Sequence, residues 1–172
     1  LIASLGSKNI DSRQDGVSLD PALGRSSYLF NTTIEGIENA DALLIIGSNP
    51  RVEAAVLNAR IRKRQRMGHF PIALIGEQAD LTFDYAYLGA GTQTLAKLPK
   101  SALDFLTKAE RPAIIVGSGA LGGEGGPAVL NALGALAKTV GVVADGWNGF
   151  NVLHHAASRV AGLDMGFVPA DG

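Results

Sequence analysis

A glycine-rich segment is the most conspicuous candidate for chemistry in this sequence. Gly117, Gly119 and Gly122 form a G-x-G-x-x-G pattern after an apolar run, and Asp145 follows 23 residues later (145 minus 122). Glycines at this spacing let the backbone approach a pyrophosphate, and the acid can bind a ribose hydroxyl of NAD. The glycine run continues beyond Glu124, however, so the helix should begin after the pattern, and Glu124 would oppose a phosphate. We therefore expect a strand–helix turn here, with an NAD site as the alternative.

A second candidate loop, Gly47-Ser48-Asn49-Pro50, also follows an apolar run and leads into a predicted helix. Backbone amides and the helix dipole at such a turn favour an anion. The same residues are explained without a ligand, because asparagine is a preferred N-cap and proline suits the first helical position. From spacing alone we favour the capping interpretation.

Five basic residues crowd the second half of the helix that follows this loop: Arg60, Arg62, Lys63, Arg64 and Arg66. Cations near a helix C-terminus stabilise it by a few tenths of a kcal/mol, roughly, and need no partner for that. We therefore expect a solvated face, with contact to an acidic partner surface as the alternative.

Histidine and serine chemistry finds little support. His154 and His155 are adjacent, so on a helix they would diverge by about 100° and could not share a metal easily. Ser118 lacks the G-x-S-x-G elbow of serine hydrolases, and Trp147 lies among turn residues, where packing explains it. The sequence therefore predicts no catalytic residue and no metal site.

The composition limits the function classes. With 172 residues, 47% of them hydrophobic and 18% charged, the chain is expected to form one globular domain over residues 1–172. A net charge of -1 provides no global field for nucleic acid, and no apolar run approaches the roughly 20 residues of a membrane span. Because the sequence has no cysteine, a disulfide or a thiolate-bound cluster is excluded within it. The start at Leu1 suggests a piece of a larger protein.

Alternating elements predict the fold. Apolar runs followed by glycine indicate buried strands at residues 42–46, 72–75 and 113–116, with a fourth strand at 141–144. Residues before 32 and from 77 to 93 show no clear period and are expected to be loops or caps over the sheet edge. Such alternation predicts an α/β, doubly wound, mostly parallel sheet with helices on both faces. The expected helices cover residues 33–39, 52–66, 97–109, 127–138 and 151–161.

Several segments together resemble a known family. Gly-Ser-Asn-Pro is similar to a loop of the molybdopterin oxidoreductases. The longer Asn49-Pro50-Arg51 run, with Glu53-Ala54, resembles the branch formed by the large peripheral-arm iron–sulfur subunits of NADH:quinone oxidoreductase, or complex I. The resemblance covers nearly the whole chain and is carried by residues 31–36 (NTTIEG), 40–51 (ADALLIIGSNPR), 58–63 (NARIRK), 146–148 (GWN) and 151–154 (NVLH).

The resemblance implies a non-catalytic structural domain of a larger subunit. Electron-carrying iron–sulfur clusters would lie in the N-terminal region of that subunit, outside this sequence. Residues 47–50 would be the vestige of a loop that holds a pterin dinucleotide in active relatives, and this chain would hold no cofactor. Partners would be other peripheral-arm subunits, on the cytoplasmic side of a bacterial inner membrane or on the matrix side in mitochondria. The alternative is an autonomous oxidoreductase domain that binds NAD or a pterin dinucleotide at either glycine loop.

Overall fold

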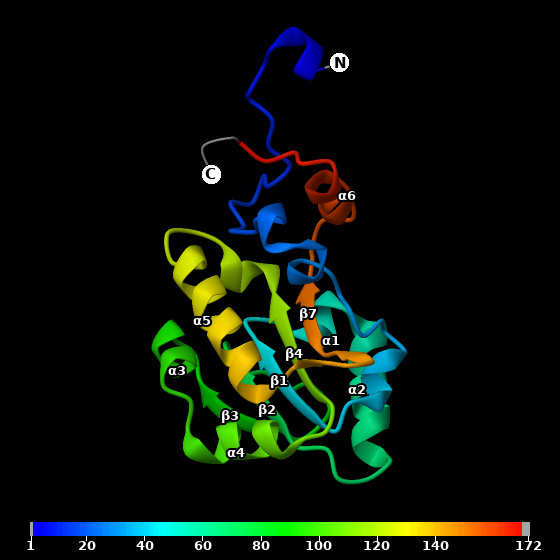
Figure 1. Cartoon of the computed structure of the whole chain (residues 1–172). Coiled ribbons are helices and arrows are strands. Elements are labelled where there is room, and N and C mark those ends of the chain that lie inside the picture. The colour runs from blue at the N-terminus through cyan, green and yellow to red at the C-terminus, as the bar shows by residue number, and fades with distance from the viewer. Residues whose placement is uncertain (1, 170–172) are drawn as a thin grey trace.

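The computed structural model describes residues 2–169 and shows three layers (Figure 1). A central five-stranded sheet has the order β3-β2-β1-β4-β7, and all its neighbouring strands pair in parallel. Helices α3, α4 and α5 cover one face of the sheet, whereas α2 covers the other. The predicted α/β fold with a parallel sheet and helices on both faces is therefore confirmed.

The elements have the following bounds. The sheet consists of β1 (Ala42–Ile46), β2 (Ile72–Ile75), β3 (Ala86–Gly89), β4 (Pro112–Gly117) and β7 (Phe150–Leu153). The short strands β5 (Val143–Ala144) and β6 (Trp147–Asn148) form a separate antiparallel pair. The α-helices are α1 (Pro50–Glu53), α2 (Ala55–Arg66), α3 (Thr92–Ala96), α4 (Lys100–Lys108), α5 (Gly126–Val140) and α6 (Arg159–Asp164). The 3₁₀ helices are η1 (Ala3–Leu5), η2 (Pro21–Leu23), η3 (Arg25–Ser27), η4 (Gly36–Asn39) and η5 (Ser118–Leu121).

Strand β1 forms the centre of two hydrophobic cores. Leu44 belongs to the core shared with α4 and α5, and Leu43 belongs to the core shared with α2. This division follows from the pleat of a strand, which directs successive side chains to opposite faces. Every residue of β1 is at most 3% exposed, as expected for a parallel strand covered on both sides.

The last strand of the sheet differs from the prediction. The expected fourth strand at residues 141–144 is wrong, because Gly141 ends α5 in the left-handed conformation (φ 66°) and only Val143–Ala144 pair, with β6. The edge position is taken by β7, where a helix over 151–161 was expected. A buried polar residue concealed this strand: Asn151 is 0% exposed and its amide donates to the carbonyls of Ile114 and Gly149. The helix in this region, α6, begins only at Arg159.

Other bounds also differ from the expected ones. The region from 77 to 93, expected to be a loop or cap, contains β3 and the start of α3. Strand β3 is an edge strand whose residues are exposed or half-buried, unlike the fully buried β1, β2 and β4. The helix expected at 33–39 is limited to the single turn η4, and the one expected at 97–109 is reduced to α4. The helix expected at 52–66 is interrupted at Ala54, whose φ of -151° and ψ of 67° separate α1 from α2. Helix α5 contains the whole expected helix 127–138.

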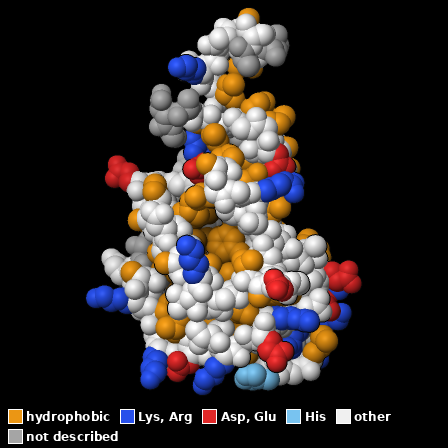
Figure 2. All heavy atoms as spheres, in the orientation of Figure 1, with side chains coloured by type: hydrophobic (Ala, Val, Ile, Leu, Met, Phe, Trp, Pro, Cys, Tyr) orange, Lys and Arg blue, Asp and Glu red, His pale blue; other side chains and the backbone are white. Residues whose placement is uncertain are grey.

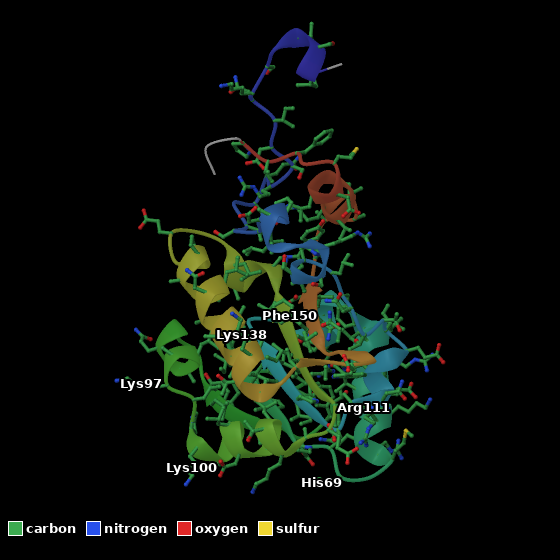
Figure 3. All side chains as sticks on the ribbon, viewed as in Figure 1. His69, Lys97, Lys100, Arg111, Lys138 and Phe150 are labelled. Atoms are coloured by element: carbon green, nitrogen blue, oxygen red, sulfur yellow. The ribbon has the colours of Figure 1, made fainter. Side chains whose placement is uncertain are left out.

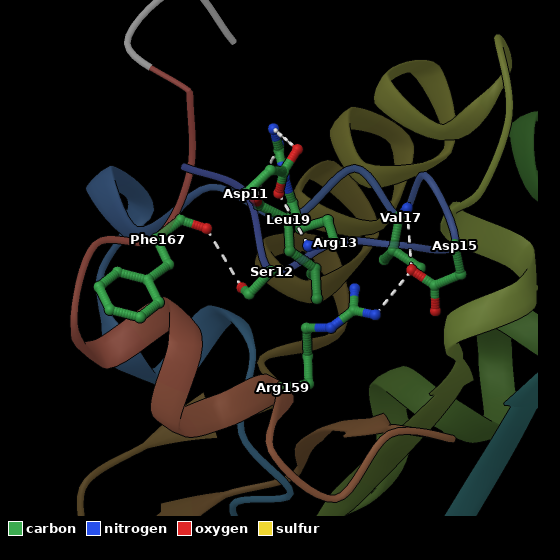
Figure 4. Close-up of polar contacts among 8 residues, drawn as sticks. All are labelled: Asp11, Ser12, Arg13, Asp15, Val17, Leu19, Arg159 and Phe167. Carbon is green, nitrogen blue, oxygen red and sulfur yellow. Dashed lines mark hydrogen bonds and ion pairs between the residues drawn. The ribbon is translucent and has the colours of Figure 1, made fainter. Parts of the chain in front are cut away.

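Residues 10–31 pack over one end of the sheet and against α6, whereas the described residues before them are exposed and extend away from the body (Figures 1 and 4). Val17 and Leu19 enter the core, which confirms the expected cap. Arg159, only 3% exposed, forms an ion pair with Asp15 at 2.8 Å, and Ser12 Oγ donates to the Phe167 carbonyl at 3.2 Å (Figure 4). These contacts join the first and last parts of the described chain.

We expect Leu44→Ala to lower the free energy of unfolding by about 2–5 kcal/mol, because it leaves a cavity in a core that cannot easily collapse. Leu44 is 0% exposed. The matched control is Val56→Ala, since Val56 is 65% exposed and its truncation should change stability by less than about 0.5 kcal/mol. Urea unfolding followed by circular dichroism measures both, and equal losses would contradict this assignment of the core.

Candidate functional site

The two glycine loops predicted from the sequence meet at the carboxyl ends of the central strands β1 and β4. The chain moves from β1 to β2 on one side, whereas β4 lies on the other side of β1. Parallel α/β sheets bind ligands at such a reversal of strand order, outside the carboxyl ends of the strands. Gly47 follows β1 and Gly117 ends β4, so both candidate loops lie at the place where a ligand would be expected.

Backbone atoms of the two loops are in direct contact. A Cβ added to Gly117 would overlap the carbonyl oxygen of Gly47, and one added to Gly47 would lie 2.5 Å from the Cβ of Ala120. Gly47 also has a φ of 57°, which a larger residue rarely adopts. These glycines therefore allow the loops to pack on each other, and the loops themselves fill the space directly between β1 and β4.

A cavity of about 340 Å³ remains beside this contact, over the ends of β1 and β2. Its apolar floor includes Ile46, Ile75 and Leu95. The only charged side chains among its described lining residues are the carboxylates of Glu53 and Glu77, and no lysine or arginine is among them. The cavity therefore has the position of a ligand site but the wrong charge for a phosphate or pyrophosphate.

Glu53 occupies the donors of the Gly47–Pro50 loop. Its Oε1 accepts a hydrogen bond from the backbone amide of Asn49 at 2.7 Å, and its Oε2 accepts one from Ser48 Oγ at 2.9 Å. Oε2 also accepts from His155 Nε2 at 3.0 Å, which reaches it from the segment after β7. The Glu53 side chain is 21% exposed. One carboxylate thus connects the loop, the single turn of α1 and the segment after the last sheet strand.

The electrostatic effect of these contacts favours the ionised acid. Burial raises the pKa of Glu53, but the hydrogen bonds from the Asn49 amide, His155 and Ser48 outweigh it, so the pKa is lowered overall from its ordinary value of 4.5. The carboxylate is therefore a fixed negative charge on the loop at neutral pH.

Asn49 stands at the N-cap of α1, as predicted, but its side chain does not do the capping. Pro50 takes the first turn of α1, as predicted, but the Asn49 side chain makes no capping hydrogen bond. Its Oδ1 is buried without a partner among the described residues. The Glu53 carboxylate instead accepts from the Asn49 amide at the helix start, as the acid of a capping box does from one position nearer the cap. An acid four residues after Asn49 was the sequence signal for this contact, and neither the glycine spacing nor the helical period pointed to it.

The G-x-G-x-x-G segment does not have the geometry of a dinucleotide site. Its residues form η5, and α5 begins only at Gly126, as expected from the long glycine run. Asp145 lies in the turn between β5 and β6, where the neighbouring Trp147 donates its indole N–H to the carbonyl of Pro112 at 2.9 Å. Pro112 begins β4, about 16 Å from the end of that strand at 3.3 Å per residue. Asp145 therefore lies near the amino ends of the sheet strands, whereas the glycines lie at their carboxyl ends. Trp147 packs against the core, as expected.

Most of the predicted contact cations are engaged within the chain. Arg60 and Lys63 both pair with Glu38 at 2.6 Å, and Arg64 lies over the ring of Phe70 and donates to the Ala40 carbonyl. Arg62 is exposed and has no ion pair among the described residues. The partner-contact prediction stays a prediction and now rests mainly on Arg62.

The two histidines diverge, as expected. His154 Nε2 lies 2.6 Å from the Tyr28 carbonyl, whereas His155 contacts Glu53. Burial lowers the pKa of His154, which favours its neutral form.

Within residues 2–169 no group of three or more acidic, histidine or cysteine side chains could hold a metal ion. Ser118 is buried, and its hydroxyl has no partner in that range, so no nucleophile and base are brought together there. No helix in the same part of the chain is long and apolar enough to span a membrane.

A second cavity, of about 670 Å³, lies between α5 and the β5–β6 pair. Figures 2 and 3 show it as an apolar hollow near Phe150, with Lys138 at its rim. Lys138 is the only charged residue among the described residues that line it. The hollow therefore offers packing surface but no group that could act as an acid, base or nucleophile on its own.

Comparison with known proteins gives consistent relatives. The molybdopterin oxidoreductase family matches residues 1–172. The chain is 41% identical to the mitochondrial NADH dehydrogenase [ubiquinone] iron–sulfur protein 1 of Solanum tuberosum, over 98% of this chain and 23% of that protein. It is 42% identical to the mitochondrial NADH-ubiquinone oxidoreductase 78 kDa subunit of Candida albicans, over 97% and 24%. It is 40% identical to an NADH-quinone oxidoreductase subunit of Rickettsia bellii, over 96% and 25%. The chain thus spans about a quarter of the length of these curated relatives.

The contact between the two loops leads to a prediction for the glycines. Gly117→Ala should lower the free energy of unfolding by about 1–3 kcal/mol, because the new Cβ would collide with the Gly47 backbone. Gly119→Ala is the control, since a Cβ there meets nothing within 4 Å, and its effect should stay within about 0.5 kcal/mol. Guanidinium unfolding measures the free energy of unfolding of both variants. Similar losses for the two would mean that the loops are not packed as described.

The pKa of Glu53 leads to a prediction for pH. Because that pKa is lowered in the folded chain, ionised Glu53 stabilises the fold fully above pH 4.5, and the contribution is lost as pH falls through the lowered value. Glu53→Gln should therefore cost about 1 kcal/mol at pH 7 and progressively less in more acidic solution. Urea unfolding of both proteins at pH 7 and at about pH 4 measures the difference. A difference that stays constant or grows in acid would contradict the assignment.

Proposed function

Because this chain belongs to the molybdopterin oxidoreductase family, we propose that it is a non-catalytic structural domain of the large iron–sulfur subunit of complex I. In this proposal the complete complex transfers electrons from NADH to quinone, and this domain supplies contact surface. Its partners are other subunits of the peripheral arm, on the cytoplasmic side of a bacterial inner membrane or on the mitochondrial matrix side. The iron–sulfur clusters lie elsewhere in the parent subunit.

The observation that carries the proposal is that the position where this fold would bind a ligand is occupied by the chain itself. The sheet, its order and the loop after β1 are all present, yet loop backbone fills the space between β1 and β4, and Glu53 takes the loop's donors. A pterin dinucleotide brings a pyrophosphate, and the described residues of the adjoining cavity offer it two carboxylates and no cation. The residues present therefore do not fit that cofactor, and they give no support to the alternative of an autonomous NAD- or pterin-binding oxidoreductase.

The contact surface we assign is the outer face of α1 and α2. Val52 is 79% exposed, Val56 is 65% exposed and Met67 is 65% exposed. Exposed apolar side chains mark an interaction surface when they gather on one part of a protein, as these do on two consecutive helices. Arg62 is also exposed, and it lines a surface pocket together with Met67. Exposed apolar side chains beside an unpaired cation suit a partner surface that combines apolar and acidic side chains.

Assembly tests this role. Val56→Asp in the full-length subunit should reduce incorporation into complex I by about tenfold or more, because it places a charge in an apolar contact, an effect of at least roughly 1.4 kcal/mol. The stability of the variant chain itself should change by less than about 0.5 kcal/mol, since the residue is exposed. Native gel electrophoresis of membranes and NADH:quinone activity report the assembly.

The matched control is Met165→Asp, which introduces the same charge at an apolar residue that is 61% exposed at the end of α6. It should leave assembly much closer to normal. Normal assembly of Val56→Asp would contradict contact through this face. Stabilisation of the unaltered chain by NADH or by a molybdopterin dinucleotide would contradict the non-catalytic role itself, because a ligand at 100 times its dissociation constant adds about 2.7 kcal/mol.

A further inference from the structure

The loop after β1 keeps the groups that hold an anion. Gly47 turns the chain with a φ of 57°, which brings the backbone amide of Asn49 and the hydroxyl of Ser48 to the same carboxylate. Backbone amides and hydroxyls gathered at a strand–helix turn are the donors that proteins use for phosphate. Here both donors point to one anion, and that anion belongs to the chain.

The carboxylate of Glu53 uses both its oxygens in this contact. Oε1 accepts from the Asn49 amide at 2.7 Å, and Oε2 accepts from Ser48 Oγ at 2.9 Å and from His155 Nε2 at 3.0 Å. A phosphate oxygen needs the same donors and carries the same sign of charge. The two anions cannot share the loop, because like charges at contact distance repel strongly in a partly desolvated site.

Nothing else among the described residues of the cavity compensates for this negative charge. The other ionisable lining residue is Glu77, a second acid, and no basic residue is among the described residues that line the cavity. Helix α1 has only four residues and is separated from α2 by the break at Ala54, so the dipole of the long α2 does not add to the loop amides. His155 is already directed at Glu53.

We propose that Glu53 is an internal substitute for a phosphate group, and that it makes the cavity at the end of β1 refuse phosphate-bearing ligands, including nucleotides and pterin dinucleotides. This inference rests on the proposed function in one respect, that the domain works without a bound cofactor. It adds a local cause for the absence of phosphate binding. Replacing Glu53 should reverse that absence, because this single side chain occupies donors that are otherwise intact.

The substitute also has a structural consequence that a free phosphate would not have. Glu53 is covalently part of α1, and through His155 it joins the loop after β1 to the segment after β7. The carboxylate therefore holds the two sides of the switch point together, which an empty anion site could not do.

The test is whether removal of the carboxylate restores anion binding. We expect the unaltered chain to show no measurable binding of inorganic pyrophosphate or GDP by isothermal titration calorimetry. Glu53→Ala frees the Asn49 amide and Ser48 Oγ and removes a charge, so its affinity for pyrophosphate should rise at least about tenfold, equivalent to about 1.4 kcal/mol. Circular dichroism establishes that the variant remains folded.

The matched control is Glu77→Ala, which removes the same charge from the same cavity without freeing a donor of the loop. Its gain should be clearly smaller, and an equal gain would overturn the proposal by showing that net charge alone is responsible. Glu53→Gln removes the charge but keeps a side chain on the loop, so it should gain less than Glu53→Ala. If Glu53→Ala does not fold, Glu53→Gln must still bind pyrophosphate better than the unaltered chain.

Failure of this inference is distinguishable from failure of the proposed function. Refusal of pyrophosphate by all four proteins would overturn the role of Glu53 and leave the structural role intact. Binding of pyrophosphate or GDP by the unaltered chain, with no gain in Glu53→Ala, would overturn the inference and also the cofactor-free role.

Discussion

The contact between the Gly47 carbonyl and Gly117 determines how the carboxyl edge of the sheet is built. Because neither position has room for a side chain, the loops after β1 and β4 come together at the place where doubly wound proteins usually leave a crevice. Gly76, after β2, extends this packing, since a Cβ there would lie 3.3 Å from the Gly47 backbone. The remaining cavity is displaced toward β2 and β3. The residues that line this cavity are therefore the neighbours of the glycine contact, which provide an apolar floor and the two acids Glu53 and Glu77.

That contact also explains why two similar glycine loops have different roles. The loop after β1 has a donor set, a positive φ and an acid on it, whereas the segment from 117 to 122 supplies close packing through its first glycine and a 3₁₀ turn through the rest. A G-x-G-x-x-G pattern predicts a phosphate site only when the helix begins within it, so that its amides point at the ligand. Here α5 begins at Gly126, and the glycines serve the backbone alone.

The sequence predicts this fold well where burial is continuous and poorly where polar groups are buried. Strand β1, for example, consists of five consecutive apolar residues, and this apolar run predicted it with the same bounds that the structure shows. Strand β7 was missed because Asn151 satisfies its amide with the carbonyls of Ile114 and Gly149, a three-dimensional arrangement that a linear pattern cannot contain. The break at Ala54 was missed for a related reason: alanine favours helix, and the tertiary contact of Glu53 with the loop accompanies the change of backbone direction there. The candidate loops were found from their glycines, but the acid that controls one of them lay in the predicted helix, and its partner His155 is 102 residues away.

An internal carboxylate is a stronger barrier to phosphate than a merely unfavourable pocket. Glu53 is linked to its donors through only four residues of chain, so its effective concentration at the loop is set by geometry and, for short tethers, is at least in the millimolar range. A free phosphate must displace a carboxylate that is covalently attached to the chain, and it must do so next to a second acid, Glu77. The fold need not change for such a loss of binding, because the sheet, its two cores and the glycine contact are formed by other residues. This accounts in physical terms for how a family scaffold can keep its loop and its shape while its ligand position becomes part of the structure.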